Sequence, residues 1–200
     1  HNGVGNIVAA YTYMFDTSSA SYIDAEDIFF VCAHGNEWLY ALNDYTLYLS
    51  NIDGWGNGPK YLKWAVIYSC LVICSPMEKS DWYDVWVDPD TEDGDIFEGI
   101  HMVHGFRTSS LVSPAVAVTT DYVNRINGGQ DLLWAWFDAI DTYGMPATSN
   151  YDKGAVVFHP DHEGDTLTNF GSKPDPDHTS LKMLYHSARR RGFEKAWATH

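Results

Sequence analysis

The sequence predicts a single α/β domain built around a parallel sheet. Two observations favour this class: short, unbroken apolar segments recur along the chain, and segments with helix-capping residues lie between the later ones. Short apolar runs are typical of strands that are buried on both faces of a sheet. Strands that alternate with helices pair in parallel through right-handed crossovers. With 200 residues, 45% of them hydrophobic, the chain has the size and composition of one domain, which we assign to residues 1–200, as a complete unit or a processed piece of a longer protein.

The strands are predicted from apolar content and from the turn residues that follow. The first apolar segment is rich in β-branched and aromatic residues and stops at His34, and the third stops at Cys70. A segment between them alternates and ends in a Gly-rich turn, which is the pattern of a half-buried strand. We expect strands at residues 28–33, 46–52, 64–69, 100–106 and 155–158.

The helices are predicted from their caps. Ser113 and Pro114 are a plausible cap and first-turn residue for a helix that runs to about residue 126, where an Asn-Gly-Gly sequence stops it. Asp131 is the expected cap of a second helix over residues 132–142. The tail, residues 181–198, is predicted to be a basic amphipathic helix. With helices on both faces of the sheet, the ligand crevice is expected beyond the carboxyl ends of the strands.

Charge and cysteine content narrow the classes of partner. A net charge of -15 argues against nucleic acid, because phosphate binding requires clustered Lys and Arg. No apolar run approaches the length of about 20 residues that a membrane span requires. Three cysteines do not form a disulfide framework, although one pair among Cys32, Cys70 and Cys74 is allowed. The absence of an initial Met and the abundance of aromatic residues favour a secreted or cell-surface protein.

His34 and Cys70 are the predicted reactive pair. Each follows a buried strand directly, so both are expected at the carboxyl edge of the sheet. An imidazole beside a thiol favours the reactive thiolate and orients proton transfer. Gly35 allows close approach of the backbone to a substrate, and its amide is a candidate donor to an oxyanion.

These segments resemble the caspase, gingipain and legumain group of cysteine peptidases. In that group a histidine follows one strand of a parallel sheet and the cysteine follows the adjacent strand. The matching segments here are residues 29–35 (FFVCAHG) and 66–70 (VIYSC). The resemblance implies a caspase-like parallel-sheet sandwich and a peptide or protein substrate. The two residues before Cys70 depart from the small and acidic or Gln residues that are usual in the group.

A more local resemblance covers about residues 27–140. Residues 62–64, 97–101, 105–108 and 135–137 are similar to a bacterial and archaeal domain family of unknown function that we associate with the same caspase-like fold. The resemblance implies a fold and the position of the reactive pair, but no substrate.

Two loops contain groups that bind metals. The loop at residues 159–165 offers Asp161, His162 and Asp165 as ligands for a divalent cation. An acidic loop offers Asp88, Asp90 and Glu92 as calcium ligands, although the spacing of its Gly and Glu residues does not match an EF-hand.

His101 and His104 are expected to be a poor chelating pair, because a spacing of three residues on a strand places side chains on opposite faces. His101 alone is either an orienting partner of the reactive pair or a buried core histidine.

Three functions therefore remain open. The first is a cysteine peptidase with Cys70 as nucleophile and no required cofactor. The second is a non-catalytic caspase-like domain that binds partners or copies of itself outside the cell and is ordered by calcium. The third is a metal-dependent hydrolase that uses the histidine-rich loops.

Overall fold

The structure is a computed structural model. It describes a set of segments from residue 11 to residue 199, and statements below that something is absent concern these segments alone. They are residues 11, 14–15, 22–37, 39–42, 44–52, 54–56, 62–80, 82, 86, 96–146, 149–172, 180–187 and 192–199.

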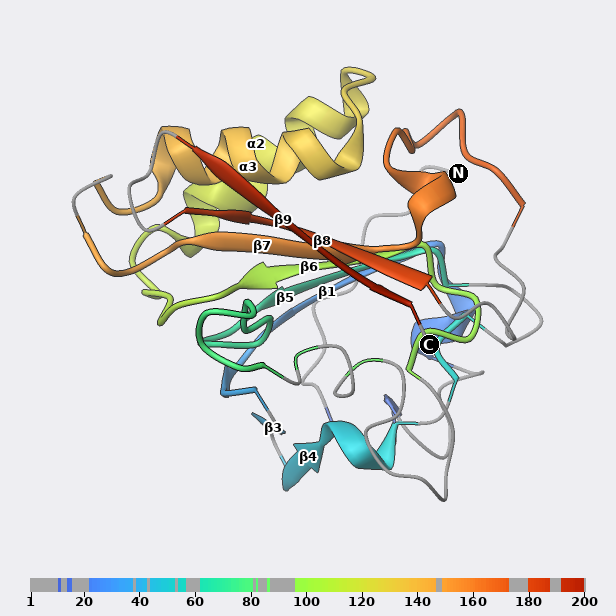
Figure 1. Ribbon diagram of the computed structural model, residues 1–200, viewed down its shortest axis with the longest axis horizontal. Coiled ribbons are helices and arrows are strands. Elements are labelled where there is room, and N and C mark those ends of the chain that lie inside the picture. Colours follow the sequence, from blue (N-terminus) through green and yellow to red (C-terminus); the bar gives the residue numbers. More distant parts are fainter. Residues whose placement is uncertain are drawn as a thin grey trace.

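A six-stranded mixed sheet forms the centre of the protein (Figure 1). The first three strands in its order run parallel, and each later strand is antiparallel to its neighbour. Every residue of the three middle strands is buried, as expected of strands covered on both faces. The strands in sheet order are β1 (Ile28–Cys32), β5 (Trp64–Tyr68), β6 (Met102–Phe106), β7 (Gly154–Phe158), β8 (Ser180–His186) and β9 (Phe193–Thr199).

Two helices, α2 (Ala115–Asn127) and α3 (Leu132–Tyr143), pack against one face of this sheet (Figure 1). Asp131 caps α3 by accepting a hydrogen bond of 2.8 Å from the Trp134 amide. Trp136 of α3 is fully buried and donates its indole N–H to the Gly105 carbonyl at 3.1 Å. The helices thus bury an aromatic layer on the sheet and are tied to it by a hydrogen bond.

A small antiparallel sheet lies on the other side of the main sheet (Figure 1). A second hydrophobic core, which includes the buried Trp55 and Trp86, fills that side. The elements of this layer are β2 (His34–Gly35), β3 (Leu39–Ala41), β4 (Thr46–Tyr48) and the 3-10 helix η4 (Leu49–Asn51), and two further 3-10 helices are η3 (Ile23–Ala25) and η5 (Pro160–His162).

The α/β class and most of the predicted elements are confirmed. The strands at 28–33, 64–69, 100–106 and 155–158 correspond to β1, β5, β6 and β7, and both predicted helices form where expected. The predicted Ser113 cap is wrong, because Pro114 is the N-terminal flanking residue of α2 and no side chain caps the helix there. The alternating segment at 46–52 is shorter as a strand than predicted, since β4 passes into η4 after Tyr48.

The predicted helix over residues 181–198 is wrong. This region contains strands β8 and β9, which pair with each other along their whole length. Residues 181 and 183–186 are buried, because β8 lies between β7 and β9 inside the sheet. Strongly buried strands lack clean alternation, so hydrophobic pattern alone does not separate them from a helix.

The layer arrangement also differs from the prediction. Both α-helices whose bounds the structure gives lie on one face, rather than on both faces. Because two helices, not one, connect β6 to β7, the chain returns antiparallel and the parallel part of the sheet ends at β6. Within the segments described, no helix has the length and apolar character needed to cross a membrane.

Candidate functional site

The carboxyl ends of β1 and β5 hold the predicted reactive pair. The two strands are parallel neighbours with Cys32 opposite Tyr68, and the Ala33 amide continues the pairing with a 3.3 Å hydrogen bond to the Tyr68 carbonyl. His34 and Cys70 each lie two residues beyond this last pair: the chain after β1 continues into the small sheet, and the chain after β5 turns, with the Ser69 amide donating to the Ile67 carbonyl at 3.0 Å. We call His34, Gly35 and Cys70 the carboxyl-edge site.

Cys70 is half-buried and is held by Ser110, which follows β6. The Ser110 amide donates to the Cys70 sulfur at 3.4 Å, and the thiol lies 3.5 Å from the Ser110 carbonyl oxygen. The next residue, Leu71, has a positive φ of 55°, so the chain turns sharply directly after the sulfur. The sulfur thus accepts a hydrogen bond from the Ser110 amide and donates one to the carbonyl of the same residue, which holds it beside the segment after β6.

His34 does not hydrogen-bond to Cys70 in the segments that the structure describes. Its side chain is exposed, whereas the sulfur is directed to Ser110. The structure thus brings the neighbouring residues Gly35 and Ser69 close together without joining the His34 and Cys70 side chains. A hydrogen bond between a nucleophile and its base often forms fully only when substrate binds.

The other two cysteines differ from Cys70. All three thiols are free, so the disulfide that the cysteine count allowed does not form. Burial raises the pKa of Cys74 to about 12, and burial also raises the pKa of Cys32. Both are therefore poor nucleophiles at neutral pH and serve as internal controls.

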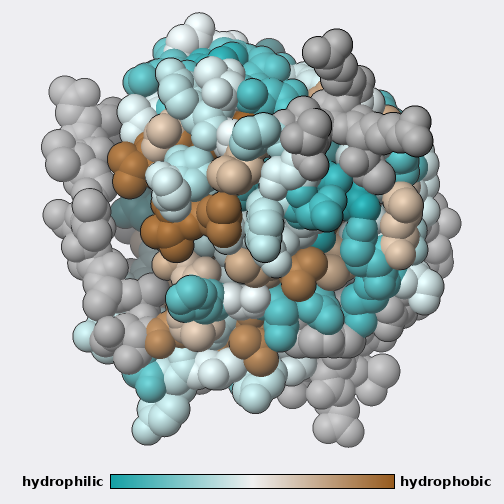
Figure 2. All heavy atoms as spheres, turned by 90° about the vertical axis from the view of Figure 1, so that its left-hand side faces the viewer, coloured by the Kyte–Doolittle hydropathy of each residue, from teal (hydrophilic) through white to brown (hydrophobic). Residues whose placement is uncertain are grey.

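Figure 2 views the carboxyl edge, and apolar side chains gather near the middle of that face. Exposed apolar residues in the segments that follow β5 and β6 include Met77, Val112 and Val116.

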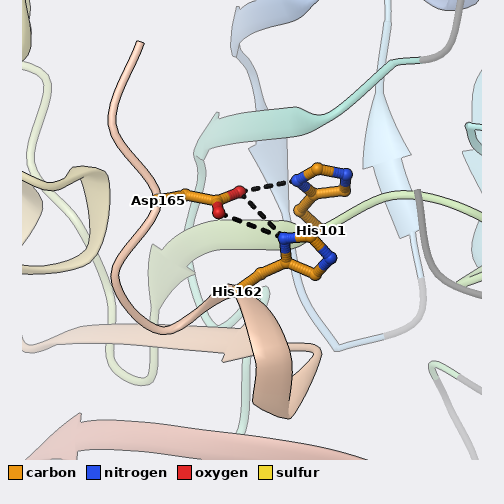
Figure 3. A group of neighbouring side chains, drawn as sticks. All are labelled: His101, His162 and Asp165. Carbon is orange, nitrogen blue, oxygen red and sulfur yellow. Dashed lines mark hydrogen bonds and ion pairs between the residues drawn. The ribbon is translucent and has the colours of Figure 1, made fainter. Parts of the chain in front are cut away.

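A second group of reactive side chains lies at the opposite, amino edge of the sheet. His101 directly precedes β6, while His162 ends η5 and Asp165 follows it (Figure 3). The antiparallel pairing of β6 with β7 brings the loop after β7 to this edge, where the His159 amide donates to the His101 carbonyl at 2.9 Å. We call His101, His162 and Asp165 the histidine–aspartate cluster.

The carboxylate of Asp165 is the centre of the cluster. Its Oδ2 atom lies 2.6 Å from Nδ1 of His101, and its Oδ1 atom lies 3.1 Å from Nδ1 of His162. The Trp64 indole N–H donates to Oδ2 at 3.1 Å. The two imidazoles are stacked, with their centroids 3.6 Å apart, and all three members of the cluster are buried.

Burial and hydrogen bonding set the charges in this cluster. Burial lowers the pKa of His101, although its hydrogen bond to Asp165 acts in the opposite direction. Burial alone would raise the pKa of Asp165, but hydrogen bonds from the two histidines bring it below its ordinary value. At neutral pH, an ionised carboxylate therefore accepts a hydrogen bond from a neutral His101 ring.

The predicted metal ligands are only partly brought together. His162 and Asp165 join the cluster, but Asp161 is exposed and contributes its backbone amide to Nδ1 of His159 instead. The predicted calcium ligands Asp88, Asp90 and Glu92 lie outside the described residues, so the calcium loop stays a prediction.

His101 is the member of the cluster that the metal-loop prediction missed. His104 packs under the helices, with Nδ1 3.1 Å from the Ala65 carbonyl, and is separate from the cluster as the strand spacing predicted. His101 lies at the opposite end of the parallel strands from Cys70, so it does not orient the reactive pair. His101 could have been identified from its position directly before β6. This strand pairs with β7, and the chain that follows β7 forms the histidine-rich loop.

Comparison with known protein families adds one finding. Residues 11–188 match the model of the family described as Domain of unknown function (DUF6345). The chain belongs to the DUF6345 family. Neither the comparison with curated proteins nor that with solved structures finds a match. The match to DUF6345 spans both edges of the sheet, so the carboxyl-edge site and the histidine–aspartate cluster both lie inside the family domain.

Proposed function

We propose that this DUF6345 protein is a cysteine peptidase with Cys70 as its nucleophile and His34 as its general base and acid. The observations that carry the proposal are the parallel pairing of β1 and β5 up to Cys32 and Tyr68, two residues before His34 and Cys70, and the close approach of Gly35 to the Ser69 side chain. The resemblance to the caspase, gingipain and legumain group, with its caspase-like sandwich, supports the same assignment. The apolar surface at this edge is suited to an extended peptide.

The proposed reaction has two stages. In the first, His34 takes the thiol proton, the Cys70 sulfur attacks the scissile carbonyl carbon, and a C–S bond forms. The C–N bond then breaks as His34 returns the proton to the leaving amine. In the second, water attacks the thioester with His34 as base, the C–S bond breaks, and the acid product and the free thiol are released.

Gly35 is the proposed donor to the oxyanion. The Asn36 amide bonds to the Leu39 carbonyl, and hydrogen-bonded pairs alternate along an antiparallel ladder. The Gly35–Tyr40 pair is therefore a non-hydrogen-bonded one, and the Gly35 amide points away from β3. A backbone amide directed to the developing oxyanion stabilises the tetrahedral intermediate.

The reaction is tested by incubating the purified protein with a peptide library and detecting new termini by mass spectrometry. We expect cleavage by the wild type, loss of cleavage in Cys70→Ala and in His34→Ala, and wild-type cleavage in Cys32→Ala, which removes the neighbouring exposed thiol. Circular dichroism verifies that each variant is folded.

Full cleavage in Cys70→Ala would refute the mechanism. A folded wild type that cleaves no peptide would favour the non-catalytic alternative, in which the domain binds partners or copies of itself. Sedimentation of the same sample would then measure self-association directly.

A further inference from the structure

We propose that the histidine–aspartate cluster is a zinc site, with His101, His162 and Asp165 as its protein ligands. Their candidate ligand atoms all lie within 4.8 Å of one another, and the group is buried. This site lies at the opposite edge of the sheet from Cys70 and does not depend on the peptidase assignment. It is built from two nitrogen ligands and one oxygen ligand, a set that suits zinc better than calcium or magnesium.

The spacing of the ligand atoms fits zinc if Nδ1 of His101 and the Asp165 carboxylate, now 2.6 Å apart, separate by about 0.8 Å. Zinc–nitrogen and zinc–oxygen bonds of about 2.0–2.2 Å place neighbouring ligands of a tetrahedron roughly 3.4 Å apart. Oδ1 and Oδ2 of Asp165 lie 3.1 and 3.2 Å from Nδ1 of His162, and Oδ2 lies 2.6 Å from Nδ1 of His101. The Nδ1 atom of each histidine is directed to the Asp165 carboxylate (Figure 3), so a zinc ion between them would hold the three side chains on one face of a tetrahedron, with the stacked rings tilted apart, and would leave the fourth position for water or another ligand.

The charge of the cluster also favours a cation. The Asp165 carboxylate is buried, and its hydrogen-bond partners within the described residues are the two imidazoles and the Trp64 indole N–H, with no Lys or Arg among them. The Trp64 contact is the kind of outer hydrogen bond that orients a carboxylate ligand on a metal. A divalent ion between the three side chains would balance the charge directly.

The ring of His101 is compatible with Nδ1 as the metal ligand. Without a metal, its Nδ1–H donates to the Asp165 carboxylate, and its Nε2 atom is buried with no hydrogen-bond partner among the described residues. Metal binding through Nδ1 therefore requires the ring proton to move to Nε2. The backbone is also held in place, because the Lys63 and His101 backbones are joined by a 2.8 Å hydrogen bond and the Asp165 carbonyl accepts from the amide of Leu132.

Metal binding to the whole wild-type chain is the first test. Cobalt(II) is titrated into the chelator-treated protein, the visible spectrum is recorded, and zinc is then added in competition. We expect one equivalent of cobalt with the strong visible bands of four-coordinate geometry, and its displacement by one equivalent of zinc. A folded wild-type protein that shows no such bands at saturating cobalt overturns the proposal.

Variants then locate the bound ion. Asp165→Asn and His162→Gln should each weaken zinc binding by about 100-fold or more, since even outer hydrogen-bond partners contribute about 10–100-fold. Asp161→Asn is the matched control, because it makes the same chemical change at an exposed position of the same loop and should bind like the wild type. If zinc binding is unchanged in both cluster variants, the site is wrong.

Cys70→Ala separates this site from the carboxyl edge. We expect this variant to keep the full cobalt spectrum while losing peptide cleavage. Loss of the cobalt bands in Cys70→Ala would place the ion at the carboxyl-edge site and overturn the cluster as a metal centre. The wild-type spectrum is decisive even if a cluster variant fails to fold.

Discussion

Gly35 lies where the chain after β1 passes close to the segment after β5, and alanine at this position tests how tightly the carboxyl edge is packed. A Cβ atom on Gly35 would lie 2.5 Å from Oγ of Ser69 and 2.6 Å from the carbonyl oxygen of Leu39. The serine hydroxyl can rotate away, but Leu39 pairs with Tyr48 of β4 and its carbonyl accepts from the Asn36 amide, so it has little freedom to move. Forcing one more carbon into such a space costs about 1–3 kcal/mol.

We therefore expect Gly35→Ala to lower the free energy of unfolding by about 2 kcal/mol. The same displacement moves the proposed oxyanion donor, so cleavage of any peptide substrate should fall as well. Urea denaturation followed by circular dichroism measures the stability change.

Gly164→Ala is the matched control, because a Cβ atom at this exposed glycine meets nothing within 4 Å. Its stability should stay within about 0.5 kcal/mol of the wild type or rise slightly, since alanine restricts the unfolded chain. If Gly35→Ala is as stable as Gly164→Ala, the close packing of the carboxyl edge is refuted.

Three further changes test the packing around the two sites. Asp131→Ala removes the cap of α3 and should cost about 1 kcal/mol in urea denaturation, and an unchanged midpoint would contradict the cap. Burial lowers the pKa of His104 to about 4, whereas the ordinary value in the unfolded chain is about 6.5. The neutral buried ring therefore contributes its full stability above a pH of about 6.5. This contribution falls by about 3 kcal/mol as the pH is lowered towards 4, because protons then bind preferentially to the unfolded chain. His104→Gln should therefore lose less stability than the wild type over that range, and an equal loss would contradict a neutral buried His104. Arg107→Met removes the hydrogen bonds to Glu78 and to the His186 carbonyl and should lower the free energy of unfolding by about 2–3 kcal/mol. Thermal denaturation measures this loss, and a Tm equal to that of the wild type would contradict it.

Local sequence signals predicted the helices and strands that are marked by a capping residue, a Gly after the helix or a continuous apolar run. Asp131 and the Gly residues after each helix marked the helix ends, and the apolar runs before His34 and Cys70 marked two buried strands. The carboxyl edge could be predicted for the same reason, since adjacent parallel strands end at one edge.

Features that depend on residues far apart in the sequence could not be predicted from these local signals. The hydrophobic pattern of the tail does not distinguish a helix from strand β8, which is buried from both sides and shows no simple alternation. The pairing of β8 with β7 depends on residues far apart in the sequence. The cluster at the amino edge was missed for a related reason. His101 and Asp165 are 64 positions apart and meet only because β7 runs antiparallel to β6.

The proposed role of Cys70 is tested most directly by the rate at which iodoacetamide alkylates each cysteine of the folded protein across pH, read out by peptide mass spectrometry. Cys32 and Cys74, whose pKa values are raised by burial, are controls within the same chain. We predict that Cys70 is alkylated fastest at neutral pH and that His34→Ala slows this reaction without affecting the other two. Alkylation of Cys70 no faster than that of Cys32, or unchanged in His34→Ala, would contradict the account.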